Sequence, residues 1–170
     1  MKNISVLAFS ALFILPALLF PLFANGAAAH ENRVTFKDVE GKEWILSEIK
    51  GPGKSVILDR EKLISENFGG VYTIIFREGD NPNAGQVNGM GAPNRFFGPY
   101  TLGNNWALSL GHLASTMMMA FREPDGLSES EYFAFLSRVT GWYLSLREGK
   151  LELYSSNSDG VEATLVFTVN

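Results

Sequence analysis

The sequence contains no cysteine and only two histidines among its 170 residues. Without cysteine, disulfide bonds, thiolate zinc sites and a lipid-modified lipoprotein cysteine are excluded. Stability must therefore come from a packed core, and a chain of this length can bury enough apolar surface to form one. Basic residues are also few, since 14 lysines and arginines stand against 18 acids and give a formal net charge of −4. That balance argues against nucleic acid as a partner.

Residues 1–29 have the pattern of a secretory signal peptide. One lysine precedes an apolar run over 6–23, and Ala27 and Ala29 form the A-x-A pattern of a cleavage site. We expect cleavage near Ala29/His30, with a cut three residues earlier as the second choice. The mature protein is then exported, and is periplasmic or secreted, in a bacterium.

An uncleaved membrane anchor is the alternative for this segment. Pro16 and Pro21 would kink a spanning helix, and no basic cluster follows to stop its transfer. We therefore expect no stable membrane span after cleavage. Residues 30–170 are the length of one ordinary domain and are expected to fold as one.

Most of the remaining chain is typical of antiparallel β structure. Runs rich in β-branched and aromatic residues alternate with turns rich in glycine and asparagine. The expected strands are 44–46, 55–58, 71–76, 96–102, 106–110, 142–146, 151–154 and 161–169. Residues 103–105 and 148–149 predict hairpin turns, and 80–85 predicts a loop.

One helix is expected after residue 128. Ser128 and Glu131 form an S-x-x-E capping box, which marks a helix start. An apolar face at helical spacing follows, made of Tyr132, Phe135, Leu136 and Val139. Gly141 is predicted to end the helix. The fold class is therefore α+β, an antiparallel β-sheet or partly open barrel with one main helix packed against it.

Three motifs follow one another between residues 40 and 168. Residues 41–46 fit the pattern G-x-x-W-x-L, residues 89–100 approximate G-x-x-G-C-N-x-F-x-G-x-Y, and residues 116–120 approximate T-x-M-A-C. The signature positions are Gly41, Trp44, Leu46, Gly89, Gly91, Gly98 and Thr116. In this order and spacing the motifs resemble the META domain, the HslJ-like family of bacterial envelope proteins.

The resemblance implies a small antiparallel β domain with a helix. It also implies a loose association with envelope stress, including heat shock, and with motility and secretion, without an established enzymatic activity. This chain departs from the family pattern at three positions. Ala92 replaces a glycine, and Pro93 and Ala120 stand where many members carry cysteine. A redox or disulfide role therefore does not carry over.

Asn94, Arg95 and Tyr100 are the candidate ligand- or partner-binding residues, because they could line a polar mouth. A structural interpretation competes and is favoured. In it, Gly89 and Gly91 adopt positive φ, the asparagine bonds to backbone amides in a turn, and the tyrosine buries its ring.

His30 and His112 are the candidate metal ligands. After cleavage the first would carry a free α-amine that could hold Cu(II) weakly, and the second could complete the site. The run Met117–Met119 could form a Cu(I) site or an adaptable apolar surface. Because neighbouring side chains point in different directions, core packing by one or two of them is favoured. No cofactor is expected.

The sequence offers no coherent catalytic set. Serines lie near His112, but the nucleophile-elbow pattern G-x-S-x-G does not occur. We expect a non-enzymatic interaction module that binds an unknown envelope protein or an apolar small molecule. An enzyme with an unrecognised site and a weak copper binder are the alternatives. A binding module should show an apolar cavity or exposed hydrophobic patch, and an enzyme a cleft with a perturbed titratable residue.

Overall fold

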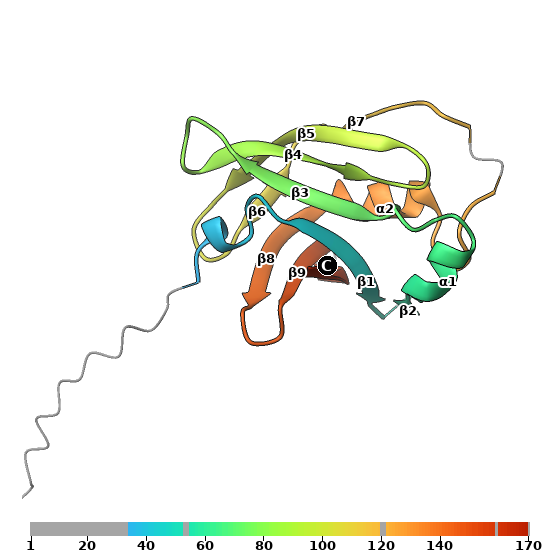
Figure 1. The fold of residues 1–170 in the computed structure, drawn as a ribbon. Coiled ribbons are helices and arrows are strands. Elements are labelled where there is room, and N and C mark those ends of the chain that lie inside the picture. Colours follow the sequence, from blue (N-terminus) through green and yellow to red (C-terminus); the bar gives the residue numbers. More distant parts are fainter. Residues whose placement is uncertain (1–33, 53–54, 120–121, 159, 170) are drawn as a thin grey trace, which may run out of the picture. The chain divides into compact units, whose positions relative to one another are not determined.

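Strand pairing in the computed structural model is antiparallel throughout the described residues, which are 34–52, 55–119, 122–158 and 160–169. The sheet has the order β6-β5-β4-β3-β1-β10-β9-β8, and it curls into a half-barrel (Figure 1). These strands are β1 (Glu43–Lys50), β3 (Thr73–Glu78), β4 (Ala84–Met90), β5 (Arg95–Leu102), β6 (Leu108–Leu110), β8 (Val139–Ser145), β9 (Lys150–Asn157) and β10 (Gly160–Val169). With its main helix, this is the expected α+β class.

Short elements complete the fold. Strand β2 (Val56–Ile57) pairs with β1, and β7 (Ala114–Ser115) pairs with β5. A 3-10 helix, η1 (Phe36–Asp38), precedes β1, and the helices are α1 (Arg60–Ser65) and α2 (Glu129–Leu136). Among the described residues, no helix is long and apolar enough to cross a membrane.

The two outer strands of the half-barrel meet at one end. Ala107, just before β6, forms an isolated bridge with Gly141 of β8. The Trp142 amide donates to the Trp106 carbonyl at 3.0 Å, and the two indole rings lie 4.9 Å apart. Beyond this point β7 pairs only with β5 in the described part of the chain, so the barrel stays open there.

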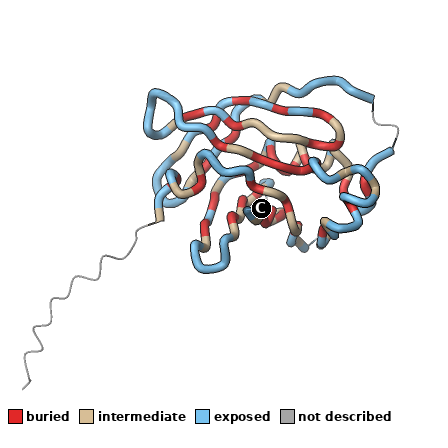
Figure 2. Tube along the Cα trace, viewed as in Figure 1, coloured by how far each residue is buried: buried red, intermediate tan, exposed pale blue. Residues whose placement is uncertain are grey.

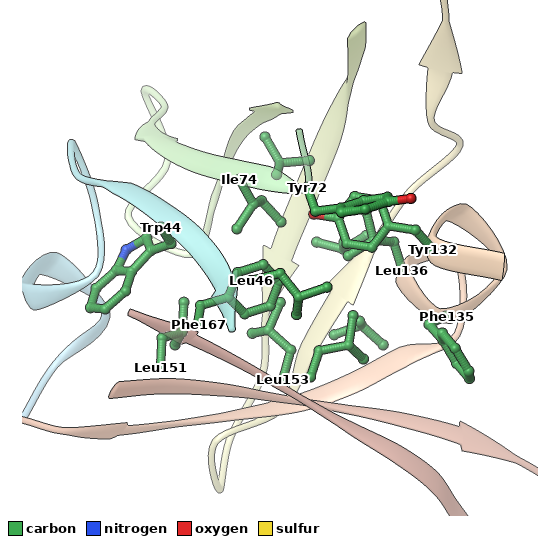
Figure 3. Packing of buried hydrophobic residues seen from close by; sticks show 14 of the residues in the cluster. Trp44, Leu46, Tyr72, Ile74, Tyr132, Phe135, Leu136, Leu151, Leu153 and Phe167 are labelled. Carbon is green, nitrogen blue, oxygen red and sulfur yellow. The ribbon is translucent and has the colours of Figure 1, made fainter. Parts of the chain in front are cut away.

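The core fills the concave side of the sheet (Figures 2 and 3). Trp44 is 1% exposed, and its indole N–H donates to the Val39 carbonyl at 2.8 Å, which satisfies the one polar atom of the ring. Leu46 and Phe167 pair across β1 and β10 and are buried with it. Along β10, Ala163, Leu165 and Phe167 face the core and are buried, whereas Val169 at the end of the strand is half-exposed.

Helix α2 begins as predicted and ends earlier. Ser128 accepts from the Glu131 amide at 3.3 Å, and its own amide donates to the Glu131 carboxylate at 3.0 Å. The helix stops at Leu136, so the prediction that Gly141 ends it is wrong. Val139 and Gly141 belong to β8 instead, because the edge there pairs with β9 and bridges to Ala107. Tyr132 and Leu136 are fully buried against the sheet (Figure 3).

Three other parts of the chain differ from the sequence prediction. Helix α1 was not expected, although Asp59 caps it by accepting from the Lys62 amide at 3.0 Å. Strand β4 (Ala84–Met90) includes the last two residues of the loop predicted over 80–85 and the glycine-rich segment that follows. In addition, Trp106 does not begin a strand, since it follows Asn105 in the left-handed region with φ of 65°. The hairpins between β5 and β6 and between β8 and β9 are confirmed.

Candidate functional site

Asn94, Arg95 and Tyr100 do not share one polar mouth. Arg95 is exposed on the convex side of the sheet, whereas Tyr100 is 1% exposed in the core. Asn94 lies in the turn between β4 and β5 and is only 7% exposed. The three residues therefore have three separate surroundings.

The Asn94 side chain makes all four of the hydrogen bonds that an amide can make. Its Oδ1 accepts from the Met118 amide at 2.6 Å and from the Thr116 hydroxyl at 2.9 Å. Its Nδ2 donates to the Met118 carbonyl at 3.1 Å and to Glu129 Oε2 at 2.6 Å. The asparagine joins the β4–β5 turn, residues 116–118 and the start of α2, and it has no bonding capacity left for a ligand.

Glu129 completes this junction from the first turn of α2. Its Oε1 accepts from the backbone amides of Ala92 and Asn94, both at 2.6 Å. Three amide donors thus surround one carboxylate, an arrangement in which charge-assisted hydrogen bonds are strong. The turn is therefore held to the helix by charge and not by apolar contact alone.

Gly89 and Gly91 have a different role from the one expected. Neither is among the positive-φ glycines of the described residues, which are Gly41, Gly126, Gly149 and Gly160. A Cβ on Gly89 would lie 2.0 Å from the Thr73 carbonyl oxygen, and one on Gly91 would lie 2.4 Å from Glu129 Oε1. These glycines allow close approach of neighbouring groups, so the prediction of positive φ is wrong.

Tyr100 and the remaining signature positions stabilise the fold. The Tyr100 hydroxyl donates to Glu40, and burial, with that hydrogen bond, raises the pKa of the phenol well above its usual value. Gly41 has φ of 73° in the turn before β1. A Cβ on Gly98 would lie 2.7 Å from the His112 carbonyl oxygen. Trp44, Leu46 and Thr116 take up the core and junction positions described above.

The methionine run is not in the core. Met117, Met118 and Met119 are 98%, 61% and 84% exposed, which contradicts the expectation that one or two of them pack inside. The reason is the junction, because Asn94 holds the main chain of Met118 and leaves the side chains to point away from the domain.

His112 lies at a groove between α2 and the open end of the sheet, which we call the helix–sheet groove. Its volume is about 530 Å³. The lining residues are Phe96, Leu110, Gly111, His112, Leu113, Ser115, Phe133 and Ser137. Apart from the histidine, none of these was singled out as a site residue from the sequence. Within the described ranges β7 pairs only with β5, so no further strand fills the space between β7 and α2.

The copper hypothesis requires His30 close to His112, and His30 lies outside the described residues. No group of three or more histidine or acidic side chains with metal-binding geometry occurs in the described part of the chain.

A smaller groove of about 240 Å³ lies between β2 and α1, where Lys62 and Asp125 pair at 2.8 Å. Among the described residues, half of the groups with a shifted pKa are tyrosines, such as Tyr72 and Tyr132, whose pKa is raised chiefly by burial.

Comparison with known proteins agrees with this architecture. A solved structure, described as the NMR structure of the protein from Burkholderia xenovorans, shares the fold with a TM-score of 0.54 and 22% sequence identity. The likeness covers 79% of this chain and 85% of that one. No curated protein gives a significant match. The META domain family matches residues 37–167, which is most of the sequence. The chain therefore belongs to the META domain family.

Proposed function

We propose that this protein is an exported, non-enzymatic binding module whose helix–sheet groove receives an apolar small molecule, such as an acyl chain or a hydrophobic ring compound. The observation that carries the proposal is the composition and size of the groove. Its apolar walls come from Phe96, Leu110, Leu113 and Phe133. A volume of about 530 Å³ falls within the range of small-molecule sites, which are mostly apolar with a few polar groups.

The polar residues of the groove favour an amphiphilic ligand. His112, Ser115 and Ser137 are exposed, while Phe96 is 1% exposed. An apolar chain would cover the partly exposed side chains of Leu113 and Phe133, since Phe96 and Leu110 are already buried. A hydroxyl or carboxyl head would stay beside the imidazole and the hydroxyl groups at the mouth.

The walls of the groove are held in place without a ligand. The Phe96 and Phe133 rings lie 5.5 Å apart in an edge-to-face contact, which joins the sheet to α2. Leu113 is packed close to Gly98, since a Cβ on that glycine would come within 2.9 Å of the leucine side chain. A preformed site costs little ordering on binding, which favours affinity.

The test is binding of a neutral fluorescent apolar probe, 1-N-phenylnaphthylamine, followed by its displacement with palmitate. The informative variant is Ser115→Trp, which fills the groove from an exposed position on β7 without removing a core side chain. Ser109→Trp is the matched control, because Ser109 is exposed on neighbouring β6 and does not line the groove.

We expect the wild type and Ser109→Trp to bind the probe and release it to palmitate. Ser115→Trp should lose at least about tenfold in affinity, the equivalent of 1.4 kcal/mol. Absence of probe binding to the wild type would overturn the proposal. Equal binding by both tryptophan variants would place the probe elsewhere and overturn it as well.

Export is the second part of the proposal and has its own test. It is supported by the signal-peptide pattern of residues 1–29. Intact mass of the protein from the envelope fraction of its host should correspond to a chain that begins at His30. A mass that retains the first 29 residues would contradict cleavage.

A further inference from the structure

The methionine run after β7 holds most of the sulfur of this protein in three consecutive residues. The chain has five methionines and no cysteine, and three of the five are Met117, Met118 and Met119. Met117 and Met119 are the two most exposed large hydrophobic side chains in the described part of the chain, at 98% and 84% (Figure 2). None of the three lines the helix–sheet groove. Neither core packing nor that groove therefore accounts for them.

The main chain is fixed on both sides of Met117. The Thr116 amide donates to the Arg95 carbonyl at 3.0 Å, and the Thr116 hydroxyl donates to Asn94 Oδ1 at 2.9 Å. At Met118 the same Oδ1 accepts from the backbone amide at 2.6 Å, and Asn94 Nδ2 donates to the backbone carbonyl at 3.1 Å. The junction therefore sets the path of the backbone without help from the methionine side chains.

The two bonds at Met118 require an extended backbone there. The N–H and C=O of one residue point to the same side in an extended chain, as in the hydrogen-bonded pairs of an antiparallel sheet, and along opposite directions in a helix. Side chains alternate between the two faces of an extended segment. Met117 and Met119 therefore share one face, with Cα atoms about 6.6 Å apart. Met118 lies on the other face, in agreement with its lower exposure of 61%.

We propose that Met117 and Met119 together form a binding site for Cu(I). Thioether sulfur is a soft ligand that suits this ion, whereas Zn(II) is bound by thiolate, imidazole and carboxylate groups. The methionine side chain has three rotatable bonds, so two thioethers on one face of an extended segment can turn toward the same ion. The site is independent of the helix–sheet groove. It also differs from the copper hypothesis for His30 and His112, which concerns Cu(II) and nitrogen ligands.

The division of the run between two faces favours an ion over an apolar partner. Apolar docking surfaces are contiguous patches of about a few hundred Å². Here Met118 faces away from its two neighbours, and the polar residue Thr116 precedes them. A partner lying on one face would cover only two methionine side chains. A single ion needs two sulfur atoms on one face and no contiguous area.

The experiment is an NMR titration of the protein carrying ¹³C-methyl methionine. Ag(I), a soft ion of the same charge that is stable in air, is added first in a chloride-free buffer. Cu(I), kept reduced with ascorbate, and Zn(II) are added in separate titrations. Each methyl signal reports one methionine, and Met90 is the internal reference, because it lies apart on β4 and is only partly exposed.

Three variants locate the site. Met117→Leu and Met119→Leu each remove one sulfur atom with little change of volume. Met118→Leu is the matched control, because it makes the same change on the other face of the segment. All three side chains are exposed, so the fold should tolerate each substitution, and circular dichroism checks this.

The methyl signals of Met117 and Met119 should shift together with Ag(I) and with Cu(I), but not with Zn(II). Met117→Leu and Met119→Leu should each bind at least about tenfold more weakly, and Met118→Leu should bind like the wild type. No shift of the wild type up to about 1 mM Ag(I) would overturn the proposal. Shifts that Cu(I) does not reproduce, or an equal loss in all three variants, would overturn it too. None of these results bears on probe binding in the helix–sheet groove.

Discussion

Glu129 and Asn94 are 35 residues apart in sequence and are joined by two hydrogen bonds of 2.6 Å, one from the backbone amide and one from the side-chain amide of the asparagine. The carboxylate starts α2, and the asparagine ends the turn before β5. This pair therefore fixes the position of the helix on the sheet, and with it one wall of the helix–sheet groove.

Removing the Glu129 carboxylate should lower the free energy of unfolding. Glu129→Ala leaves three part-buried amide donors without a partner, so we expect a loss of about 2–4 kcal/mol in the free energy of unfolding. Glu129→Gln should cost less, because one oxygen still accepts the two backbone amides. Urea unfolding is the measurement, and exposed Glu123→Ala serves as the control. A Glu129→Ala protein as stable as the control would show that the junction carries no net stability.

Trp44 should be a major contributor to the core. It is 1% exposed and its N–H is bonded, so Trp44→Ala should cost about 3–5 kcal/mol. Trp106→Ala is the matched comparison, because that ring is 47% exposed and rests on Trp142. We expect about 1 kcal/mol there. Similar losses for both variants in thermal or urea unfolding would contradict the assignment of Trp44 to the core.

Stability should fall at high pH. In the native state the pKa of Tyr100 is raised by burial and by the hydrogen bond to Glu40, and that of Tyr154 is raised to about 12. An unfolded tyrosine loses its proton near pH 10. Above that value the unfolded chain binds fewer protons than the native one, so the free energy of unfolding decreases as pH rises.

The variant Tyr100→Phe tests the source of this decrease. Its stability at about pH 8 should be lower by roughly 1 kcal/mol, because the hydroxyl no longer donates to Glu40. Its further loss between about pH 9.5 and 11 should be smaller than that of the wild type. Urea unfolding across this range is the measurement, with exposed Tyr143→Phe as the control. An unchanged pH slope in Tyr100→Phe would exclude this tyrosine as a cause.

Two glycines should respond differently to alanine. Gly41→Ala places a side chain at φ of 73° with nothing within 4 Å, so the expected cost is the left-handed penalty of about 1–2 kcal/mol. Gly89→Ala sets a Cβ 2.0 Å from the Thr73 carbonyl oxygen and 2.7 Å from the Phe96 ring. Backbone and ring cannot both move aside, so unfolding should be easier by about 3 kcal/mol or more. The opposite order of stabilities in urea would contradict this account.

The sequence predicted the helix start and most strands because their signals are local. Ser128 and Glu131 lie within one turn of each other, and the strands carry β-branched and aromatic runs. The helix end was missed because Val139 continues the helical spacing of apolar residues while it pairs in β8. Strand β4 was missed because Gly85, Gln86, Asn88 and Gly89 have weak strand preference. Its two partners, β3 and β5, impose the strand.

The candidate site was harder to predict for a physical reason. Asn94 was correctly interpreted as a turn-fixing residue, but its main partners, Glu129 and Met118, are distant in sequence. The helix–sheet groove depends on a missing neighbour for β7, and no residue pattern marks a missing strand. Leu113, which lines that groove from a short connection between β6 and β7, was the one available hint, because such connections ordinarily carry polar residues.

The hydrogen bonds between the Asn94 side chain and residue 118 do not depend on which side chain residue 118 carries. Both bonds go to main-chain atoms, one to the amide and one to the carbonyl. Any residue with a backbone N–H could occupy the position and be held in the same path, and proline is the one exception. The three methionines are therefore not required for the course of the chain. Selection can rewrite the chemistry of this stretch of surface while the fold beneath it stays constant.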